Sequence, residues 1–287
     1  MIPARDLIGS CDVVLVTLDS LRLDVARSAL AAGQTPNLAA LLPASGWEER
    51  HTPGSFTYAA HHAFLSGFLP TPARPGRHPR LFAAQFAGSD STTEQTFVFG
   101  QATLPGALSA RGYHTVCVGG VGFFNGQTAL GSVLPGLFAE SHWSPGLGVK
   151  NPDSAARQVQ VAAAALGALP AGKRAFLLLN VAATHTPTHF YLPGARRDSV
   201  ETQQAALASV DAALPVLLAS IRARGDALLI VCADHGTCFG DDGYWGHRIA
   251  HPAVWSVPYL ETVLIGETVL TGETVLMGET VLKGDQP

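Results

Sequence analysis

Two apolar runs, each ending abruptly in acidic side chains, constrain the fold of this chain more than any other feature. Residues 13–18 read VVLVTL and lead into Asp19, and residues 228–233 read LLIVCA and lead into Asp234 and His235. Such runs are typical of strands buried on both faces of a parallel sheet. Because open α/β sheets bind ligands beyond the carboxyl ends of their strands, we expect these three side chains to meet at one edge. Two carboxylates and an imidazole suit a cation such as Zn²⁺ or Mn²⁺.

Expected strands and helices alternate along most of the chain. Beyond the two runs, we expect strands at residues 113–118, 175–183 and 257–265, and helices at residues 24–31, 37–42, 57–66, 105–111, 154–169 and 200–223. The stretch at 68–79 is rich in Pro, Gly and Arg, which favours a loop. Strands alternating with helices of this length predict an α/β fold, a three-layer α/β/α sandwich around a mostly parallel central sheet.

The C-terminal segment has a different character. A hexad, ETVLxG, occurs there four times, starting at Glu261, Glu267, Glu273 and Glu279. Hexad repeats can build parallel β-helices, but these need many more copies. We therefore divide the chain into one domain at residues 1–260 and a repeat tail at residues 261–287. The tail has no catalytic role in this interpretation, and it could add an edge strand or support a homo-oligomer.

Composition limits the expected partners and compartment. Only 14% of residues are charged, the net charge is −4, and no block of basic residues occurs, so we expect no nucleic-acid binding. The apolar runs are strand-sized, and residues 1–8 lack the features of a signal peptide, so we expect no membrane association and a cytoplasmic protein. In that compartment the four cysteines should be reduced.

A hydroxyl at the start of an expected helix supplies a third element. Thr57 would head the helix at 57–66, where unpaired N–H groups and the positive end of the helix dipole can gather a phosphate or sulfate. A threonine hydroxyl is a poor nucleophile near neutral pH unless a metal or base activates it. Alternatively, Thr57 or Ser55 merely caps the helix, and Asp19 could likewise be an N-cap.

The order of these motifs resembles the sulfatase-like branch of the alkaline phosphatase superfamily. A strand ending in Asp is followed by a hydroxyl-headed helix closing in FLSGFLP at 64–70, by a strand leading to His-x-Pro at 185–187, and by Asp-His-Gly at 234–236. The similarity runs from about Val13 to Tyr259 and is strongest to short bacterial sulfatase-like hydrolases. It implies an alkaline phosphatase-like fold and identifies residues 1–260 as the hydrolase domain.

The resemblance also implies roles for the matching positions. Asp19, Asp234 and His235 would bind a divalent metal, and Thr57 would be both a metal ligand and the nucleophile. His185 matches a histidine that contacts the anionic group of the substrate. One or two ions are implied, with Zn²⁺ or Mn²⁺ favoured over Mg²⁺ or Ca²⁺.

Two departures from the family pattern change the expected chemistry. Ordinary sulfatases mature a Cys or Ser within Cys/Ser-x-Pro-x-Arg, whereas residues 57–61 read TYAAH, so a formylglycine mechanism is not expected. The sequence GGVGFFN at 119–125 is closer to threonine-nucleophile phosphotransferases such as lipoteichoic acid synthases. In those enzymes Arg follows the aromatic-Asn pair, and Gly126 takes that place here, which argues against recognition of a glycerol phosphate.

Four further side chains are candidates for contacts with the substrate. His247 could bind the oxyanion, protonate the leaving group or complete a second metal site, and His61 stands where sulfatases carry an Arg, so it could orient the nucleophile. Asn125 and His189 complete the set. Any of these histidines could instead be a packing, capping or exposed residue. The Gly- and Pro-rich segment at 119–153 is our candidate for the specificity loop.

These assignments predict metal-dependent hydrolysis of a small-molecule phosphate ester, or of a sulfate ester, through a phospho- or sulfo-threonine. Phosphate is favoured because an unmodified alkoxide is usual among the phosphoryl-transfer members of the superfamily. One alternative is a phosphotransferase that uses an organic acceptor. Another is a non-catalytic metal-binding scaffold protein that assembles through its tail.

Overall fold

A computed structural model describes residues 2–67, 82–83, 97–98 and 103–266 of the 287-residue chain. Its centre is a seven-stranded sheet with the order β2-β11-β8-β1-β7-β5-β6. The strands are β1 (Asp12–Leu18), β2 (Glu48–His51), β5 (His114–Val118), β6 (Glu140–His142), β7 (Ala175–Val181), β8 (Ala227–Cys232) and β11 (Ser256–Leu264). Five neighbours, β8 to β6, are parallel, and β11 runs antiparallel to both β8 and β2.

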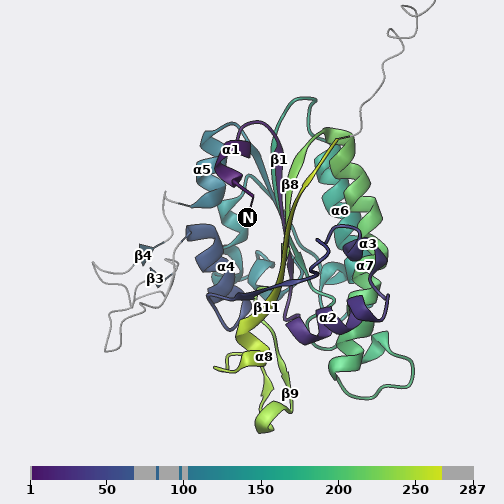
Figure 1. Ribbon diagram of the computed structural model, residues 1–287. Helices are drawn as coiled ribbons and strands as arrows, with labels where there is room; N and C mark the ends of the chain where they lie inside the picture. Colours follow the sequence, from purple (N-terminus) through teal and green to yellow (C-terminus); the bar gives the residue numbers. More distant parts are fainter. Residues whose placement is uncertain (1, 68–81, 84–96, 99–102, 267–287) are drawn as a thin grey trace, which may run out of the picture.

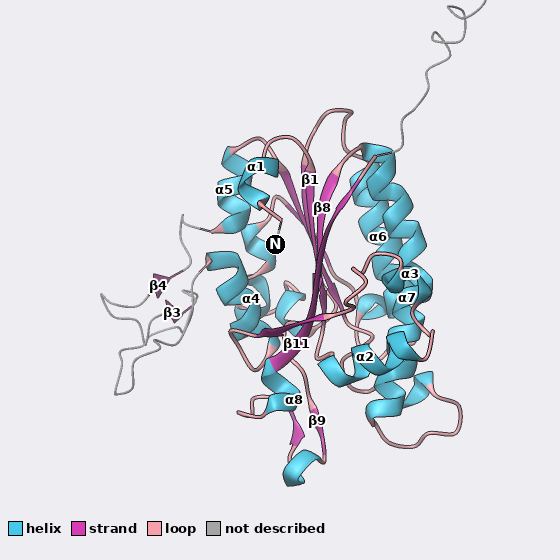
Figure 2. Ribbon diagram, viewed as in Figure 1, coloured by secondary structure: helices cyan, strands magenta, loops and turns pink. Residues whose placement is uncertain are grey.

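Helices cover both faces of this sheet, as Figures 1 and 2 show. One face carries α2 (Leu23–Ala31), α3 (Pro36–Ala39), α6 (Ser154–Gly167) and α7 (Val200–Arg224), and the other carries α1 (Ala4–Leu7), α4 (Thr57–Ser66) and α5 (Leu104–Ala110). The predicted three-layer sandwich with a mostly parallel sheet is confirmed. The antiparallel β11 makes the sheet mixed.

Successive side chains of β1 point to opposite faces of the sheet and belong to two separate hydrophobic clusters. Val14, Val16 and Leu18 belong to the cluster beneath α6 and α7, whereas Val13 and Leu15 belong to the cluster on the opposite face. All seven residues of β1 are buried, as expected for a central parallel strand. By length and composition α7 could cross a membrane, but its apolar side chains Leu207, Val210 and Leu214 pack into the first cluster.

Short elements fill the remaining described segments. The expected specificity segment at 119–153 holds β6 and four 3₁₀ helices: η1 (Gly122–Phe124), η2 (Leu130–Ser132), η3 (Pro135–Leu137) and η4 (Pro145–Leu147). Further along lie η5 (His189–Tyr191), η6 (Asp241–Gly243), α8 (Pro252–Trp255) and the pair β9 (Cys238–Phe239) and β10 (Trp245–Gly246). A second two-residue pair is β3 (Phe82–Ala83) with β4 (Phe97–Val98).

The boundary drawn at residue 260 falls within β11, because this strand, expected at residues 257–265, continues into the first hexad as far as Leu264. Within β11, Glu261 pairs with Ile230 of β8 and Leu264 pairs with Ala227. Backbone pairing with β8 therefore holds residues 261–264 in the sheet. Residues 267–287, with the other hexads, and the expected loop at 68–79 lie outside the described residues.

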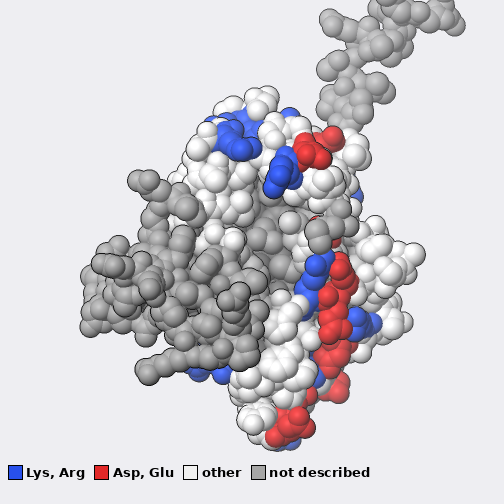
Figure 3. All heavy atoms as spheres, turned by 60° about the vertical axis from the view of Figure 1, so that its left-hand side comes forward, with Lys and Arg blue, Asp and Glu red and all other residues white. Residues whose placement is uncertain are grey.

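Two expectations from the sequence concern the cysteines and the surface charges. All four cysteines are free and buried. Exposed charges pair locally, as in Arg27–Glu49 at 3.5 Å and Arg50–Glu48 at 2.9 Å. On the face drawn in Figure 3, acidic side chains form a narrow strip with basic side chains at its edges, and a separate group of basic side chains lies near the top.

Candidate active site

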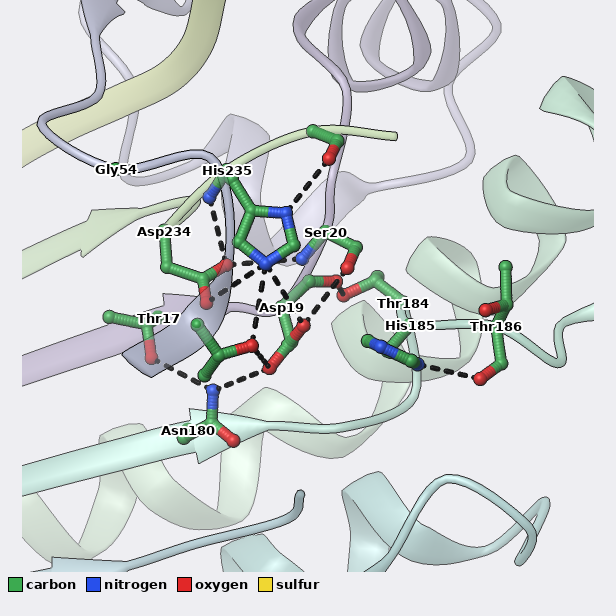
Figure 4. Close-up of polar contacts among 12 residues, drawn as sticks. Thr17, Asp19, Ser20, Gly54, Asn180, Thr184, His185, Thr186, Asp234 and His235 are labelled. Atoms are coloured by element: carbon green, nitrogen blue, oxygen red, sulfur yellow. Dashed lines mark hydrogen bonds and ion pairs between the residues drawn. The ribbon is translucent and has the colours of Figure 1, made fainter. Parts of the chain in front are cut away.

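The two neighbouring strands β1 and β8 place two acidic residues side by side. Thr17 pairs with Cys232 in the parallel register, so Asp19 and Asp234 leave the sheet at the same edge, and both are fully buried. Ser20 links them, because its backbone N–H donates to Asp234 Oδ1 at 3.1 Å and its hydroxyl donates to Asp19 Oδ1 at 3.0 Å. Figure 4 shows this corner.

His235 completes a buried group of three ligand-type side chains. Its Nε2 lies 3.8 Å from Asp19 Oδ1 and 3.6 Å from Asp234 Oδ2, and one donor atom from each of the three residues lies within 4.8 Å of the others. The convergence expected from the two apolar runs is therefore present in the structure.

Thr57 joins this group from the start of α4. Its Oγ1 donates to Asp19 Oδ2 at 3.3 Å and lies 3.3 Å from His235 Nε2. The N-cap position belongs to Phe56, and no side chain caps the helix. The alternative in which Thr57 or Ser55 is a capping residue is therefore not what the structure shows. Gly54 permits the tight approach of the chain, because a Cβ there would lie 2.5 Å from the backbone nitrogen of Ala60.

The donor set fits a divalent cation. Asp234 Oδ2 is buried and has no hydrogen-bond partner among the residues that the structure describes. The Nδ1 of His235 lies 2.8 Å from the carbonyl oxygen of Gly236, so a proton on Nδ1 leaves the Nε2 lone pair facing the carboxylates. A buried carboxylate oxygen without a donor is expensive in a protein unless a cation or proton satisfies it.

The electrostatics agree with this fit. Burial, together with the charge of Asp19, raises the pKa of Asp234 well above its usual value. Burial also lowers the pKa of His235, which favours the neutral, ligating imidazole. For Asp19 burial acts upward, but the neighbouring His185 and His235 and a hydrogen bond from Asn180 outweigh it, so its pKa is lowered. Two carboxylates in one buried site favour a bound positive charge.

A chain of buried hydrogen bonds supports Asp19 and Thr57 from below. Asn180 Nδ2 donates to Asp19 Oδ2 at 3.1 Å and to Thr17 Oγ1 at 3.3 Å. Thr17 Oγ1 lies 2.9 Å from His61 Nε2, and His61 Nδ1 lies 2.8 Å from the carbonyl oxygen of Thr57. A neutral His61 protonated on Nδ1 satisfies every bond in this chain, and burial lowers the pKa of His61 to about 4.

The position of His61 corrects one expected contact. The side chain is fully buried beneath Thr57 and is not part of the cavity lining, so it cannot touch a substrate there. Its hydrogen bond to the Thr57 carbonyl instead agrees with the alternative that it orients the nucleophile.

A cavity of about 310 Å³ opens beside Thr57 and brings two further histidines to the site. His185 and His247 both line it, with ring centroids 5.5 Å apart, and the His247 ring lies 4.6 Å from that of His235. Burial, with His235 and His185 nearby, lowers the pKa of His247 to about 4.

Two expected substrate contacts lie elsewhere. Asn125 is not part of the cavity lining, and its Oδ1 accepts from the backbone of Gln127 at 2.8 Å. His189 is 41% exposed and pairs with Asp198 at 3.0 Å. Neither placement supports a direct contact with a substrate in this cavity, because both polar groups have local partners.

The two supporting residues Thr17 and Asn180 were not predicted from the sequence. Thr17 and Asn180 are polar residues inside otherwise apolar buried strands, at positions paired across β1 and β7. The available signal was the single polar residue inside each apolar run, because a polar side chain in a strand buried on both faces requires a partner.

Comparison with known proteins identifies the family. The sulfatase family model matches residues 12–261. The chain belongs to the sulfatase family. No match was found among curated proteins.

Solved structures share the fold at low sequence identity. The C-terminal periplasmic domain of the phosphoethanolamine transferase EptC from Campylobacter jejuni is 13% identical, with a TM-score of 0.60 over 88% of this chain and 79% of that one. A putative sulfatase from Bacteroides thetaiotaomicron is 13% identical, with a TM-score of 0.60 over 90% and 64%. The corresponding EptC domain from Escherichia coli, solved as a complex with Zn, is 13% identical, with a TM-score of 0.55 over 90% and 73%.

Proposed function

We propose that this sulfatase-family protein cleaves a phosphate ester, with sulfate esters as the second candidate class, and that Thr57 is its nucleophile. One observation carries the proposal. The Thr57 hydroxyl lies 3.3 Å from both Asp19 Oδ2 and His235 Nε2, at the start of a helix, and the same residue lines a cavity.

Asp19, Asp234, His235 and Thr57 would hold the divalent cation that this chemistry needs, with Zn²⁺ or Mn²⁺ as the best candidates. When bound, such an ion lowers the pKa of a hydroxyl and offsets negative charge on a substrate oxygen. Asp19 accepts the hydrogen bond of the Thr57 hydroxyl and thereby fixes the direction of its oxygen. The backbone N–H groups at the start of α4 add positive potential at the same point.

The reaction then proceeds in two displacements. The Thr57 hydroxyl loses its proton as its oxygen forms a bond to phosphorus, the bond from phosphorus to the ester oxygen breaks, and the departing alcohol oxygen takes up one proton. Water next attacks the phosphothreonine, which releases phosphate and restores the hydroxyl. His185 and His247 line the cavity, where they can hydrogen-bond the phosphoryl oxygens or serve the departing alcohol.

Phosphate is favoured over sulfate because an unmodified threonine replaces the residue that ordinary sulfatases mature. Transfer to an organic acceptor is the second candidate, since two of the structural neighbours named above are phosphoethanolamine transferases. Both candidates use the same first displacement and differ in whether water or an alcohol makes the second.

The test is a hydrolysis screen of protein loaded with Zn²⁺ or Mn²⁺. Aryl phosphate, diaryl phosphate, aryl phosphonate ester and aryl sulfate are compared for wild type, Thr57→Ala and Thr57→Ser, with metal content measured in each. We expect turnover of at least one ester, its loss in Thr57→Ala and partial retention in Thr57→Ser.

Other outcomes separate the alternatives. Product that exceeds hydrolysis when glycerol or ethanolamine is supplied indicates transfer. Full activity in Thr57→Ala contradicts the nucleophile, and bound metal with no turnover of any ester indicates a scaffold.

A further inference from the structure

The lining of the cavity beside Thr57 divides into two chemical parts. The catalytic part consists of Thr57, His185 and His247. The rest is supplied mainly by the specificity segment at 119–153, with four apolar side chains, two glycines and one hydroxyl. We call the four apolar side chains the apolar wall; they are Val121, Phe123, Leu130 and Val149.

The aromatic member of this wall is held against the nucleophile. The Phe123 ring packs on Tyr58 with a centroid distance of 5.6 Å and on Phe56 at 6.3 Å. Those two residues flank Thr57 at the start of α4. Phe123 is therefore held close to the attacking oxygen, as a preformed binding site requires.

The backbone behind the wall is closely packed. Gly131 of η2 lies against η1, where a Cβ would come within 2.2 Å of Asn125 Oδ1 and 2.8 Å of the carbonyl oxygen of Gly122. Its carbonyl oxygen accepts from the backbone N–H of Gly126 at 3.0 Å. Gly131 thus allows η1 and η2 to bring Phe123 and Leu130 to the same cavity.

Among the residues that the structure describes, no Lys or Arg lines this cavity. Arg248 follows His247, and Lys150 follows Val149, but both are exposed residues outside the lining. A charged leaving group placed against the apolar wall would lose water without gaining an ion pair, which is unfavourable. A polyol would leave several hydroxyls unpaired, since Thr128 offers the one hydroxyl outside the catalytic part.

We propose that the apolar wall is the leaving-group subsite and that it selects esters of a compact, uncharged, apolar alcohol over esters of polyols and charged alcohols. The proposal rests on the proposed function of Thr57 and adds the substrate class. The cavity volume of about 310 Å³ is at the small end of the range of roughly 300–1,000 Å³ usual for ligand sites, which suits an alcohol the size of benzyl alcohol.

The experiment compares three esters that share one transferred group. Benzyl phosphate, methyl phosphate and glycerol 3-phosphate are assayed, or the matching sulfates if the hydrolysis screen shows a sulfatase. The proteins are wild type, Phe123→Ala and the control Phe190→Ala, a partly buried phenylalanine outside the cavity. We expect wild-type kcat/KM for the benzyl ester to exceed that for the glycerol ester by on the order of 100-fold.

The variants show whether the preference comes from the wall. Phe123→Ala should lower kcat/KM for the benzyl ester about tenfold, mainly through KM, and lower that for the methyl ester much less. Phe190→Ala should change neither. Leu130→Ala, in the same wall, should repeat the pattern, so the result does not depend on one variant being well folded.

Two results overturn the subsite and are distinguishable from failure of the proposed function. If wild type turns over the glycerol and benzyl esters equally well, or if Phe123→Ala and Leu130→Ala slow all three esters alike, the wall does not select the alcohol, although ester cleavage stands. If wild type cleaves none of the esters, the proposed function fails and the subsite with it.

Discussion

The site has two regions that are built in different ways. The ligand layer, which consists of Asp19, Asp234 and His235 with Thr57 above them, stands on the ends of two adjacent parallel strands and the start of a helix. The apolar wall instead stands on the 3₁₀ turns and loops between β5 and α6. In the proposed account, regular topology therefore positions the reacting groups, whereas irregular segments select the substrate. The two regions should therefore respond separately to mutation.

The largest difference between the two regions is expected when a metal-binding residue is replaced. Asp234→Asn removes a charge from the fully buried layer, and we expect loss of bound metal and a fall in activity of at least about 10³-fold, beyond the roughly 10–100-fold usual for residues that only support ligands. Metal content and kcat/KM are the measurements. Asp211→Asn is the matched control, because this buried carboxylate accepts hydrogen bonds from Asn37 and Leu38 and should affect stability alone.

Loss of a supporting residue should have a smaller effect on the same layer. Asn180→Ala removes the donor to Asp19 Oδ2, and we expect metal affinity to fall about 10–100-fold, with activity restored by excess metal. Competition with a chelator measures the affinity. Gln158→Ala removes hydrogen bonds to the backbone of Asn180 and Ala182, at β7, and should leave the metal affinity unchanged. Equal losses in the two variants would mean that Asn180 acts only on stability.

The wall can be disturbed without touching the ligands. Gly131→Ala forces η1 and η2 apart, so we expect about 1–3 kcal/mol of lost stability in urea unfolding and a raised KM, with metal content unaltered. At Gly136 an added Cβ meets nothing within 4 Å, so Gly136→Ala is the control. Loss of metal in Gly131→Ala would show that the two regions are not independent.

The smallest effect is expected at the outer edge of the ligand layer. Arg22 joins the chain after Asp19 to the loop after His235, through Thr237 and Asp241, and its hydrogen bond lowers the pKa of Asp241 to about 2. Because that pKa lies below the unfolded value of 3.8, the pair stabilises the fold above about pH 4, and this stabilisation is lost as the pH falls toward 2.

Asp241 is 27% exposed, so solvent screening keeps the contribution below ~1 kcal/mol. Urea unfolding of wild type and Asp241→Asn should differ by this amount at pH 6 and converge as the pH approaches 2. Asp242→Asn serves as the neighbouring control. A constant difference across the pH range would exclude the ion pair as its cause.

The same contrast explains what the sequence could predict. The ligand layer was predictable because apolar runs mark buried strands, and parallel strands end at one edge. Strand β2 was not predictable, because its sequence EERH carries no apolar pattern. It forms only as an edge strand paired with β11. The structure does not support the substrate contacts expected of His61, Asn125 and His189, which lie outside the cavity lining. Their surroundings depend on long-range packing, which neither spacing nor local pattern encodes.

The central claim is that one cation lies among Asp19, Thr57, Asp234 and His235. Anomalous diffraction from crystals grown with Zn²⁺ or Mn²⁺ tests it directly. A second candidate position for comparison is the partly buried edge group in which His114 and His142 both contact Glu140, at 2.9 and 2.6 Å. We predict a metal peak within bonding distance of the Asp-Asp-His group and the Thr57 oxygen. A peak at the edge group alone, or none at the strand ends, would contradict the account.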